Sequence, residues 1–189
     1  ESPMIRILIA LALAATALPA RAEIGEINLA QQFGISFMPL MLMEDAKLIE
    51  KHAKLQGLPE PKVTWAKVAG PSVMNEGLLS GALHFTSTGV PSLGLLWDKT
   101  KGNVGVKGVA AICAYPLYLN VRNPAVKSLK DFTDKDRIAI PSAKTSSQAI
   151  VLQIAAAKEW GEAGYARLDP MTVSMSHPDA MTAVLNPSH

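Results

Sequence analysis

The sequence has one cysteine and no long block of charge of a single sign. Because Cys113 stands alone, one copy of the chain cannot form an internal disulfide, a CxxC redox pair or a cysteine-based zinc site. The 18 basic and 16 acidic residues give a formal net charge of +2 and are dispersed along the chain. Nucleic-acid binding needs clustered cations, so we expect no nucleic-acid partner.

Motifs of the common enzyme classes are missing too. The sequence contains no GxGxxG, GxxxxGK[ST], GxSxG or HExxH. These motifs bind nucleotides, position a nucleophile or bind a catalytic metal. The histidines, which are His52, His84, His177 and His189, have no metal-ligand spacing. We expect His84 to be structural or at the surface, Glu44 and Asp45 to be a solvated pair, and Cys113 to be an inert buried thiol. The sequence therefore predicts a protein that is not an enzyme and has no cofactor and no metal.

The chain opens with a segment that resembles a secretory signal peptide. Residues 4–22 hold a start Met4, the cation Arg6, an apolar run over residues 7–18 and a small-x-small triplet at residues 20–22. This layout is typical of a cleavable leader, and the run is shorter than the about 20 residues of a membrane span. We expect residues 1–22 to be leader sequence and the mature protein to be soluble and periplasmic.

After this segment, strand-like and helix-like patterns alternate in a globular composition of 49% hydrophobic and 18% charged residues. The predicted strands cover residues 26–33, 62–69, 82–88, 104–114, 117–121, 137–140 and 171–176. The predicted helices cover residues 39–57, 71–81, the stretch after 91, 128–132, the stretch after 145, and 178–185. Alternation of this kind favours α/β folds with parallel sheets. We predict a first lobe over residues 23–114, then a crossing strand and a partial second lobe over residues 115–189.

Candidate binding residues lie where predicted strands end, because ligands of open α/β sheets bind there and helix N-termini offer free N–H groups. These loops combine Gly or Pro with hydroxyl side chains, which suits a small anion, although Ser and Thr are also ordinary helix caps. Tyr115 and Tyr118 lie at the predicted joint between lobes, either as cleft walls or as packing. The candidates in the loops are Gly34, Ile35, Ser36, Phe37, Gly70, Ser72, Ser87, Thr88, Gly89, Ser142, Thr145, Ser146 and Ser147.

Three stretches together resemble the periplasmic solute-binding proteins of ABC importers, in the branch that binds nitrate, sulfonates and taurine and includes binders of thiamine pyrimidine precursors. The stretches are EINLAQQFGISFMPL, GPSVMNEGLLSGALHFTSTGVPSLGLLWDKT and DRIAIPSAKTSSQAIVLQIAAA. The resemblance covers nearly all of residues 23–189 and is most specific over residues 70–100. It implies the two-lobe type II periplasmic-binding fold, with a ligand held between the lobes.

By position, the resemblance places the loops of residues 34–37, 70–72 and 87–89 on the first-lobe side of the cleft. It places residues 115–118 at the entry to the crossing strands, and Ser142 with residues 145–147 at the anion end of the second lobe. It implies a monomer that captures a small anionic or sulfonate-like solute and delivers it to ABC permease subunits in the membrane. Family members continue through the rest of the second lobe, so the sequence is expected to be C-terminally truncated.

Other interpretations stay open at this point. One is a pyrimidine-precursor binder or an enzyme of the same fold, although the related synthases need a Cys-rich metal motif that Cys113 alone cannot supply. Another is the ligand-sensing domain of a transcription regulator, which carries a DNA-binding segment where this chain has its leader. A truncated fragment without function is the last. The ligand itself is not determined, since Trp65, Trp97 and Trp160 fit either cleft walls or core.

Overall fold

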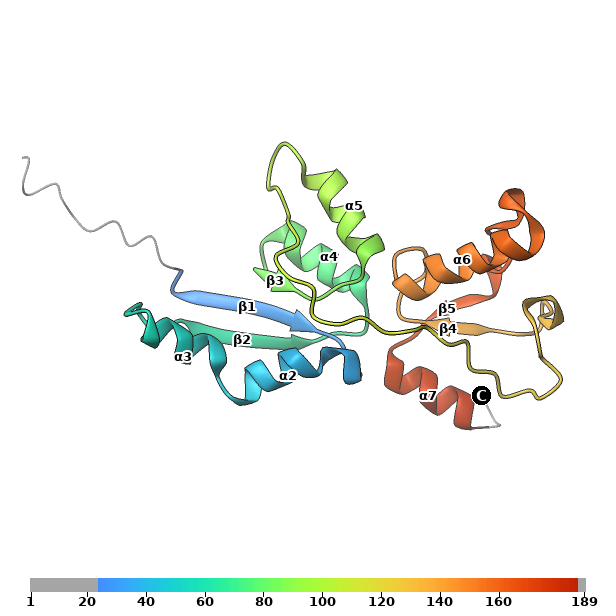
Figure 1. Ribbon diagram of the computed structural model, residues 1–189, viewed down its shortest axis with the longest axis horizontal. Helices are drawn as coiled ribbons and strands as arrows, with labels where there is room; N and C mark the ends of the chain where they lie inside the picture. The colour runs from blue at the N-terminus through green and yellow to red at the C-terminus, as the bar shows by residue number, and fades with distance from the viewer. Residues whose placement is uncertain (1–23, 187–189) are drawn as a thin grey trace, which may run out of the picture.

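The computed structural model describes residues 24–186. The expected leader over residues 4–22 lies outside the described residues. Within them, two small parallel sheets, each flanked by helices, form a mixed α/β structure (Figure 1). The α/β class predicted from the alternating pattern is confirmed. We refer to residues 26–100 as the N-terminal unit and to residues 129–185 as the C-terminal unit.

The sheet of the N-terminal unit has the strand order β2-β1-β3. Its strands are β1 (Glu26–Gln31), β2 (Lys62–Lys67) and β3 (Phe85–Thr86), and both pairings are parallel, with Glu26 opposite Lys62 and Leu29 opposite Phe85. β1 is central, and its second half is buried. The carboxyl ends of the strands therefore meet at one edge, where the loops to the following helices begin.

Helices cover both faces of this sheet (Figure 1). The short turn η1 (Ile35–Phe37), α2 (Met38–Asp45) and α3 (Leu48–Leu55) lie on one side, and α4 (Pro71–Ser80) and α5 (Val90–Thr100) lie on the other. Pro occupies the first turn of α4 and α5, where its missing N–H costs nothing. Gly81 ends α4 in the left-handed conformation, with φ of 77°.

The C-terminal unit is built from β4 (Ile138–Ile140) and β5 (Thr172–Ser174), which pair in parallel. Helices α6 (Ser147–Trp160) and α7 (His177–Leu185) lie on opposite sides of this pair (Figure 1). Three short 3-10 turns complete the unit: η2 (Leu129–Asp131), η3 (Glu162–Gly164) and η4 (Asp169–Met171). Side chains of Ile138, Ile140, Ala149, Leu152 and Leu168 form its buried core.

The strands predicted over residues 104–114 and 117–121 are wrong. Residues 101–128 contain no helix or strand and run as an extended, mostly exposed link between the units (Figure 1). A strand needs a hydrogen-bonded neighbour, and no described strand lies beside this segment. The predicted burial of Cys113 is wrong for the same reason, since its thiol lies exposed on the link.

Two other predicted elements differ from the structure. The single helix predicted over residues 39–57 is two helices, because the backbone between α2 and α3 turns at Lys47, which has a φ of 49°. A left-handed residue interrupts the helical hydrogen-bond ladder. The third predicted strand, residues 82–88, shortens to the two residues of β3.

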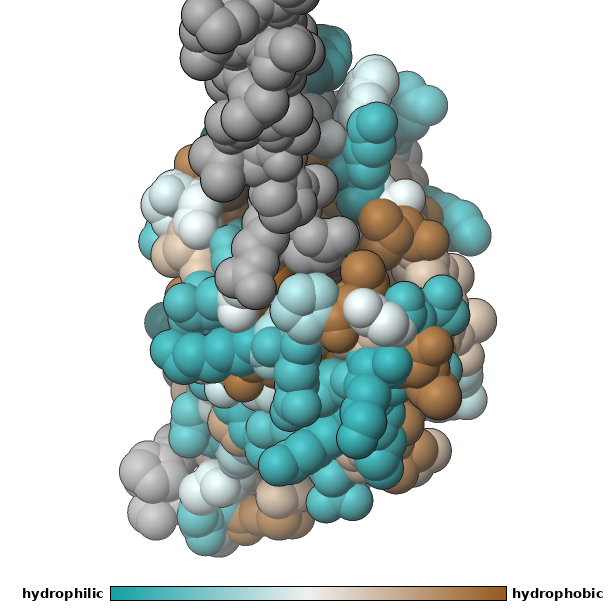
Figure 2. Space-filling view, turned by 90° about the vertical axis from the view of Figure 1, so that its left-hand side faces the viewer, coloured by the Kyte–Doolittle hydropathy of each residue, from teal (hydrophilic) through white to brown (hydrophobic). Residues whose placement is uncertain are grey.

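The end of the N-terminal unit that points away from the C-terminal unit is largely hydrophilic (Figure 2). Exposed residues there include Lys51, Lys54, Glu60 and Lys62. Hydrophobic side chains gather along one side of the same face (Figure 2). Within residues 24–186, no helix is long and apolar enough to cross a membrane.

Candidate functional site

The N-termini of α4, α5 and α6 come together where the two units meet. The loops involved are residues 70–72, 86–89 and 141–147, which we call the junction loops. Two belong to the N-terminal unit and one to the C-terminal unit. Most of the loop residues that the sequence analysis selected lie here, because the strand ends of both sheets are turned toward each other.

The first contact joins the start of α4 to the loop after β4. The backbone N–H of Ser72 donates to Ser142 Oγ at 3.5 Å, and the hydroxyls of Ser72 and Thr145 lie 3.3 Å apart. A side chain at Gly70 would collide with the carbonyl oxygen of Pro141 and lie 2.7 Å from Ser142 Oγ. Gly70 is extended, so it is required for space and not for an unusual backbone conformation.

The second contact joins the start of α5 to the start of α6. Gly89, which precedes α5, packs so closely on Ser147 that an added Cβ would overlap its hydroxyl. The glycines at positions 70 and 89 therefore permit the two units to touch. In this structure the junction loops are in direct contact.

The three helix N-termini are capped unequally. Ser146 caps α6, since its hydroxyl accepts from the N–H of Ala149 at 3.2 Å. The residues before α4 and α5 are Gly70 and Gly89, and neither helix has a side-chain cap. First-turn N–H groups without such a cap can bind another acceptor, as that of Ser72 in α4 binds Ser142 Oγ.

Buried hydroxyls without partners lie next to these uncapped ends. Thr86 Oγ1 and Thr88 Oγ1 are both buried and have no hydrogen-bond partner among the described residues. An unpaired buried hydroxyl costs about 1–3 kcal/mol, so such a group is usually matched by water or a ligand. Thr86 ends β3 and Thr88 follows it, so both precede the start of α5.

The junction loops carry positive electrostatic character. Their sequences, Gly-Pro-Ser, Thr-Ser-Thr-Gly and Pro-Ser-Ala-Lys-Thr-Ser-Ser, contain one charged side chain, that of Lys144. Each helix N-terminus adds the equivalent of about half a positive charge. Hydroxyls, free N–H groups and a cation without an acidic residue in the same loops form an environment that can accept a small anion.

Some of the predicted site residues do not take part in the junction contacts. Gly34, with φ of 116°, turns the chain after β1; Ile35 is 81% exposed, Ser36 is half-buried and Phe37 is buried in its own unit. Tyr115 and Tyr118 are 50% and 78% exposed on the link. Ser87 donates its backbone N–H to Ala30 at 3.4 Å, which extends the sheet.

The sequence analysis missed Thr86 and misjudged Glu44. Thr86 was counted as the interior of a strand, and only the early end of β3 places it beside the junction. Glu44, predicted to be solvated, accepts a hydrogen bond from Gln31 Nε2 at 2.6 Å. These partners are 13 residues apart in the sequence, so no local pattern reveals them. His84 is exposed, and its Nδ1 accepts from the N–H of Asn28 at 3.0 Å.

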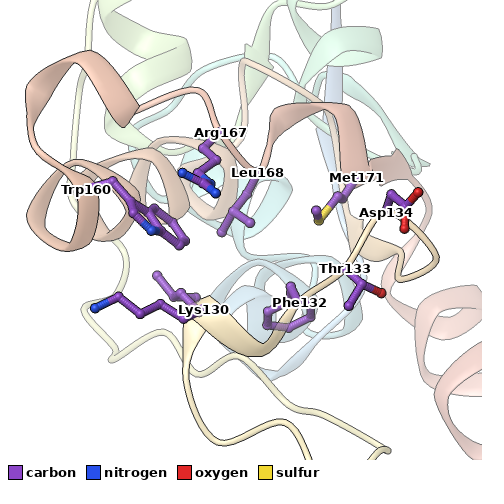
Figure 3. A pocket seen from close by; sticks show the side chains of 9 residues that line it. Lys130, Phe132, Thr133, Asp134, Trp160, Arg167, Leu168 and Met171 are labelled. Atoms are coloured by element: carbon purple, nitrogen blue, oxygen red, sulfur yellow. The ribbon is translucent and has the colours of Figure 1, made fainter.

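A separate cavity of about 500 Å³ lies in the C-terminal unit, and none of the residues that line it belongs to the junction loops (Figure 3). Its lining comes from η2 and the residues after it, from the end of α6 and from the η4 region. No sequence motif marks this cavity, although Trp160 was considered as a cleft wall.

Comparisons with protein-family models, with curated proteins and with solved structures each found no match. Among residues 24–186, no group of three or more His, Cys, Asp or Glu side chains is arranged to hold a metal ion.

Proposed function

We propose that this protein is the extracytoplasmic solute-binding component of an ABC importer. In this proposal the N-terminal and C-terminal units are the two lobes of a type II periplasmic-binding fold, and a small anionic or sulfonate-like solute binds between them. The observation that carries the proposal is the meeting of three helix N-termini, two of them uncapped, beside the unpaired hydroxyls of Thr86 and Thr88.

Each part of the junction has a role in this proposal. The N–H groups at the start of α5 donate to the anion, and that of Ser72 joins them when the units part and it leaves Ser142 Oγ. The hydroxyls of Ser72 and Thr145, which lie 3.3 Å apart, orient the anion from opposite units. Because the junction loops touch, the units must move apart to admit the solute and close again around it. The extended link of residues 101–128 permits such a movement, since it has few fixed contacts.

The remaining steps follow from the resemblance to this class of proteins. The leader at residues 4–22 directs export, the loaded protein docks on the membrane permease, and no chemical step is performed on the solute. Hydroxyl and N–H donors suit this task, because they bind an anion strongly enough to capture it without a fixed ion pair that would slow release.

A thermal-shift experiment tests the proposal. Leaderless protein is melted with taurine, alkanesulfonates, aromatic sulfonates, nitrate and bicarbonate, each in excess. A ligand present at about 100 times its dissociation constant stabilises the folded state by about 2.7 kcal/mol, which is a shift of several degrees. A selective shift by one anion supports the proposal. A cooperative melt that none of these anions moves contradicts it.

Matched serine variants locate the bound anion. Ser72→Ala removes a hydroxyl at the junction end of α4, whereas Ser80→Ala removes one at the opposite end of the same helix, where it donates to Gly77 O. We expect Ser72→Ala to weaken binding by about tenfold, the equivalent of one charge-assisted hydrogen bond. Ser80→Ala should leave binding unchanged. Equal affinities for both variants would place the ligand elsewhere.

A further inference from the structure

The cavity of the C-terminal unit combines aromatic walls with one stacked guanidinium. The Arg167 guanidinium carbon lies 4.9 Å from the ring centroid of Trp160, and both residues line the cavity from the same side (Figure 3). Stacking occupies the face of the guanidinium and leaves the N–H groups at its edge available. No carboxylate within residues 24–186 forms an ion pair with Arg167. The arrangement presents a fixed, planar donor to a ligand.

The other cation of the cavity is already neutralised. Lys130 Nζ pairs with Glu159 Oε1 at 2.5 Å, so the lysine contributes little free charge. The carboxylate of Asp134 lies at the end of the cavity away from Trp160 and Arg167 (Figure 3). A bound anion is therefore favoured at the Arg167 end and disfavoured at the Asp134 end.

Between these ends the lining is apolar. Phe132 and Met171 point into the space from opposite sides, and Leu168, a core residue that is 2% exposed, lines it with little of its surface (Figure 3). Aromatic rings pack favourably on other rings and on the thioether of methionine. A volume of about 500 Å³ is within the range of about 300–1,000 Å³ that is usual for small-molecule sites.

The wall formed by η2 is held in place by its own hydrogen bonds. Asp131 Oδ2 accepts from the backbone N–H groups of Lys127 at 2.8 Å and Ser128 at 2.7 Å, and from the Ser128 hydroxyl at 3.0 Å. These bonds lower the pKa of Asp131 below its usual value, and the bond from the Lys127 backbone has the largest effect. The carboxylate therefore stays charged, and the turn that carries Lys130 and Phe132 stays fixed near neutral pH.

The geometry points to a second binding site in this cavity, for a small aromatic carboxylate whose ring lies among Phe132, Leu168 and Met171 and whose carboxylate binds Arg167. This site is separate from the junction and does not depend on the function proposed there. Most of its affinity comes from burial of the ring, because Arg167 is exposed and its ion pair is partly screened by solvent.

Calorimetric titration of the whole chain with phenylacetate and indole-3-acetate tests the site. Phenylacetamide has the same shape without the charge, and acetate has the charge without the ring. We expect saturable binding of both aromatic acids, binding of phenylacetamide that is about tenfold weaker, and no measurable binding of acetate. Equal affinity for phenylacetate and phenylacetamide, or no saturable heat with either acid, would overturn the proposal.

Variants of Arg167 and Arg122 distinguish binding in the cavity from a general effect of the protein's charge. Arg167→Gln should remove the preference for phenylacetate over phenylacetamide, and Arg167→Lys should retain part of it. The control is Arg122→Gln, whose side chain donates to Asn186 O outside the cavity and which should bind as the unchanged protein does. If a folded Arg167→Gln protein, checked by circular dichroism, keeps the full preference, the assignment to Arg167 is wrong.

One more variant keeps this proposal distinct from the junction. Ser72→Ala should leave phenylacetate binding unchanged, even if it abolishes binding of the transported solute. If Ser72→Ala weakens phenylacetate instead, the ligand sits at the junction and the second site is overturned. The other possible occupant of the cavity is a second copy of the chain. Sedimentation of the ligand-free protein tests it: if the protein self-associates and Arg167→Gln abolishes this, a second copy covers the cavity and the ligand site is overturned.

Discussion

The N-terminal unit buries polar side chains among its apolar ones, whereas the C-terminal unit has an apolar core and keeps its buried polar side chains at one end. Gln31, Gln32, Asn75, Ser92 and Thr100 are all buried in the first. The core of the second consists of Ile138, Ile140, Ala149, Leu152 and Leu168, and its buried polar residues, Ser142 and Ser146, belong to the junction loop. The polar groups of the C-terminal unit are thus concentrated at its contact with the other unit.

Most of the buried polar groups in the N-terminal unit are paired. Ser92 donates to Asn75 Oδ1 at 2.6 Å, and the Thr100 hydroxyl donates to Leu96 O at 2.6 Å. The exceptions are Gln31 Oε1, Thr86 Oγ1 and Thr88 Oγ1, which have no partner within the described part of the chain. Unpaired polar atoms are costly in a low-dielectric interior. The N-terminal unit therefore carries unmet hydrogen-bonding capacity, whereas no buried side-chain polar atom of the described C-terminal unit lacks a partner.

The largest effect should come from truncating the apolar core of the C-terminal unit. Leu152, in α6, is 8% exposed, and its neighbour Val151 is 44% exposed. We expect Leu152→Ala to lower the free energy of unfolding by about 2–5 kcal/mol through lost burial and a cavity. Val151→Ala should change it by less than about 0.5 kcal/mol. Urea unfolding measures both, and equal losses would mean that this core is not packed as described.

The next effect concerns the contact between the units. Gly89→Ala should cost about 1–3 kcal/mol, because the new methyl group overlaps the Ser147 hydroxyl and lies 3.3 Å from its Cβ, so that either Ser147 changes rotamer or the units separate. Gly94→Ala is the matched control in the same helix, since a Cβ there meets nothing within 4 Å. It should stabilise the protein by about 0.5–1 kcal/mol through helix propensity. Thermal melts compare the two variants, and opposite signs are the expected result.

Small-angle scattering supplies a second readout for Gly89→Ala. If the units separate to accommodate the methyl group, the radius of gyration rises while the melting temperature falls little. If neither quantity changes, the close approach of Gly89 to Ser147 is not a feature of the protein in solution.

A smaller pair of effects tests the difference between paired and unpaired hydroxyls. Ser92→Ala leaves Asn75 Oδ1 buried without its donor and should destabilise the protein by about 1–3 kcal/mol. Thr86→Val replaces an unpaired hydroxyl with a methyl group of similar shape, which should be neutral or stabilising by about 1 kcal/mol in the ligand-free protein. Chemical unfolding of both variants measures these changes. A lower free energy of unfolding for Thr86→Val would show that the Thr86 hydroxyl is hydrogen-bonded.

The smallest effect is a dependence of stability on pH. Burial lowers the pKa of His177 below its usual 6.5, so the unfolded chain binds the proton more readily. Stability should therefore decline as pH falls through 6.5 toward the lower folded pKa. The pKa of Asp131 is lowered as well, by hydrogen bonds from Lys127 and then Ser128. Its contribution is present above the unfolded value of 3.8 and is lost as pH falls through the folded pKa.

Two substitutions separate these pH ranges. His177→Gln should flatten the stability profile near pH 6.5 and leave the acid limb unchanged. Asp131→Asn should lower stability above pH 3.8 and thereby flatten the acid limb. Melts recorded across a pH series measure both, and a profile near neutrality that His177→Gln does not alter would contradict the role given to burial.

The sequence predicted the elements whose signals are local. Pro at the start and Gly at the end marked α4, and the Ser and Thr cluster before α6 includes Ser146, its cap. The rule that ligands gather at the ends of parallel strands selected Ser72, Thr145 and Gly89, which the structure brings together. These features depend on backbone geometry that a few neighbouring residues determine.

Features that depend on distant partners were not predictable. Residues 104–121 alternate as a strand does, but alternation cannot show whether a neighbouring strand exists. The break at Lys47 has no Gly or Pro to mark it. The cavity in the C-terminal unit assembles residues 129–171 from several elements, so no sequence spacing indicates it.

The parallel pairing of both sheets also has a consequence for how the chain folds. Each ladder joins segments separated by a complete crossover: Glu26 meets Lys62, 36 residues later, and Ile138 meets Thr172. Closing such long loops costs entropy before any contact compensates for it. Each parallel pair can therefore form only after its whole crossover has been synthesised, so both sheets depend on contacts between segments that leave the ribosome far apart in time.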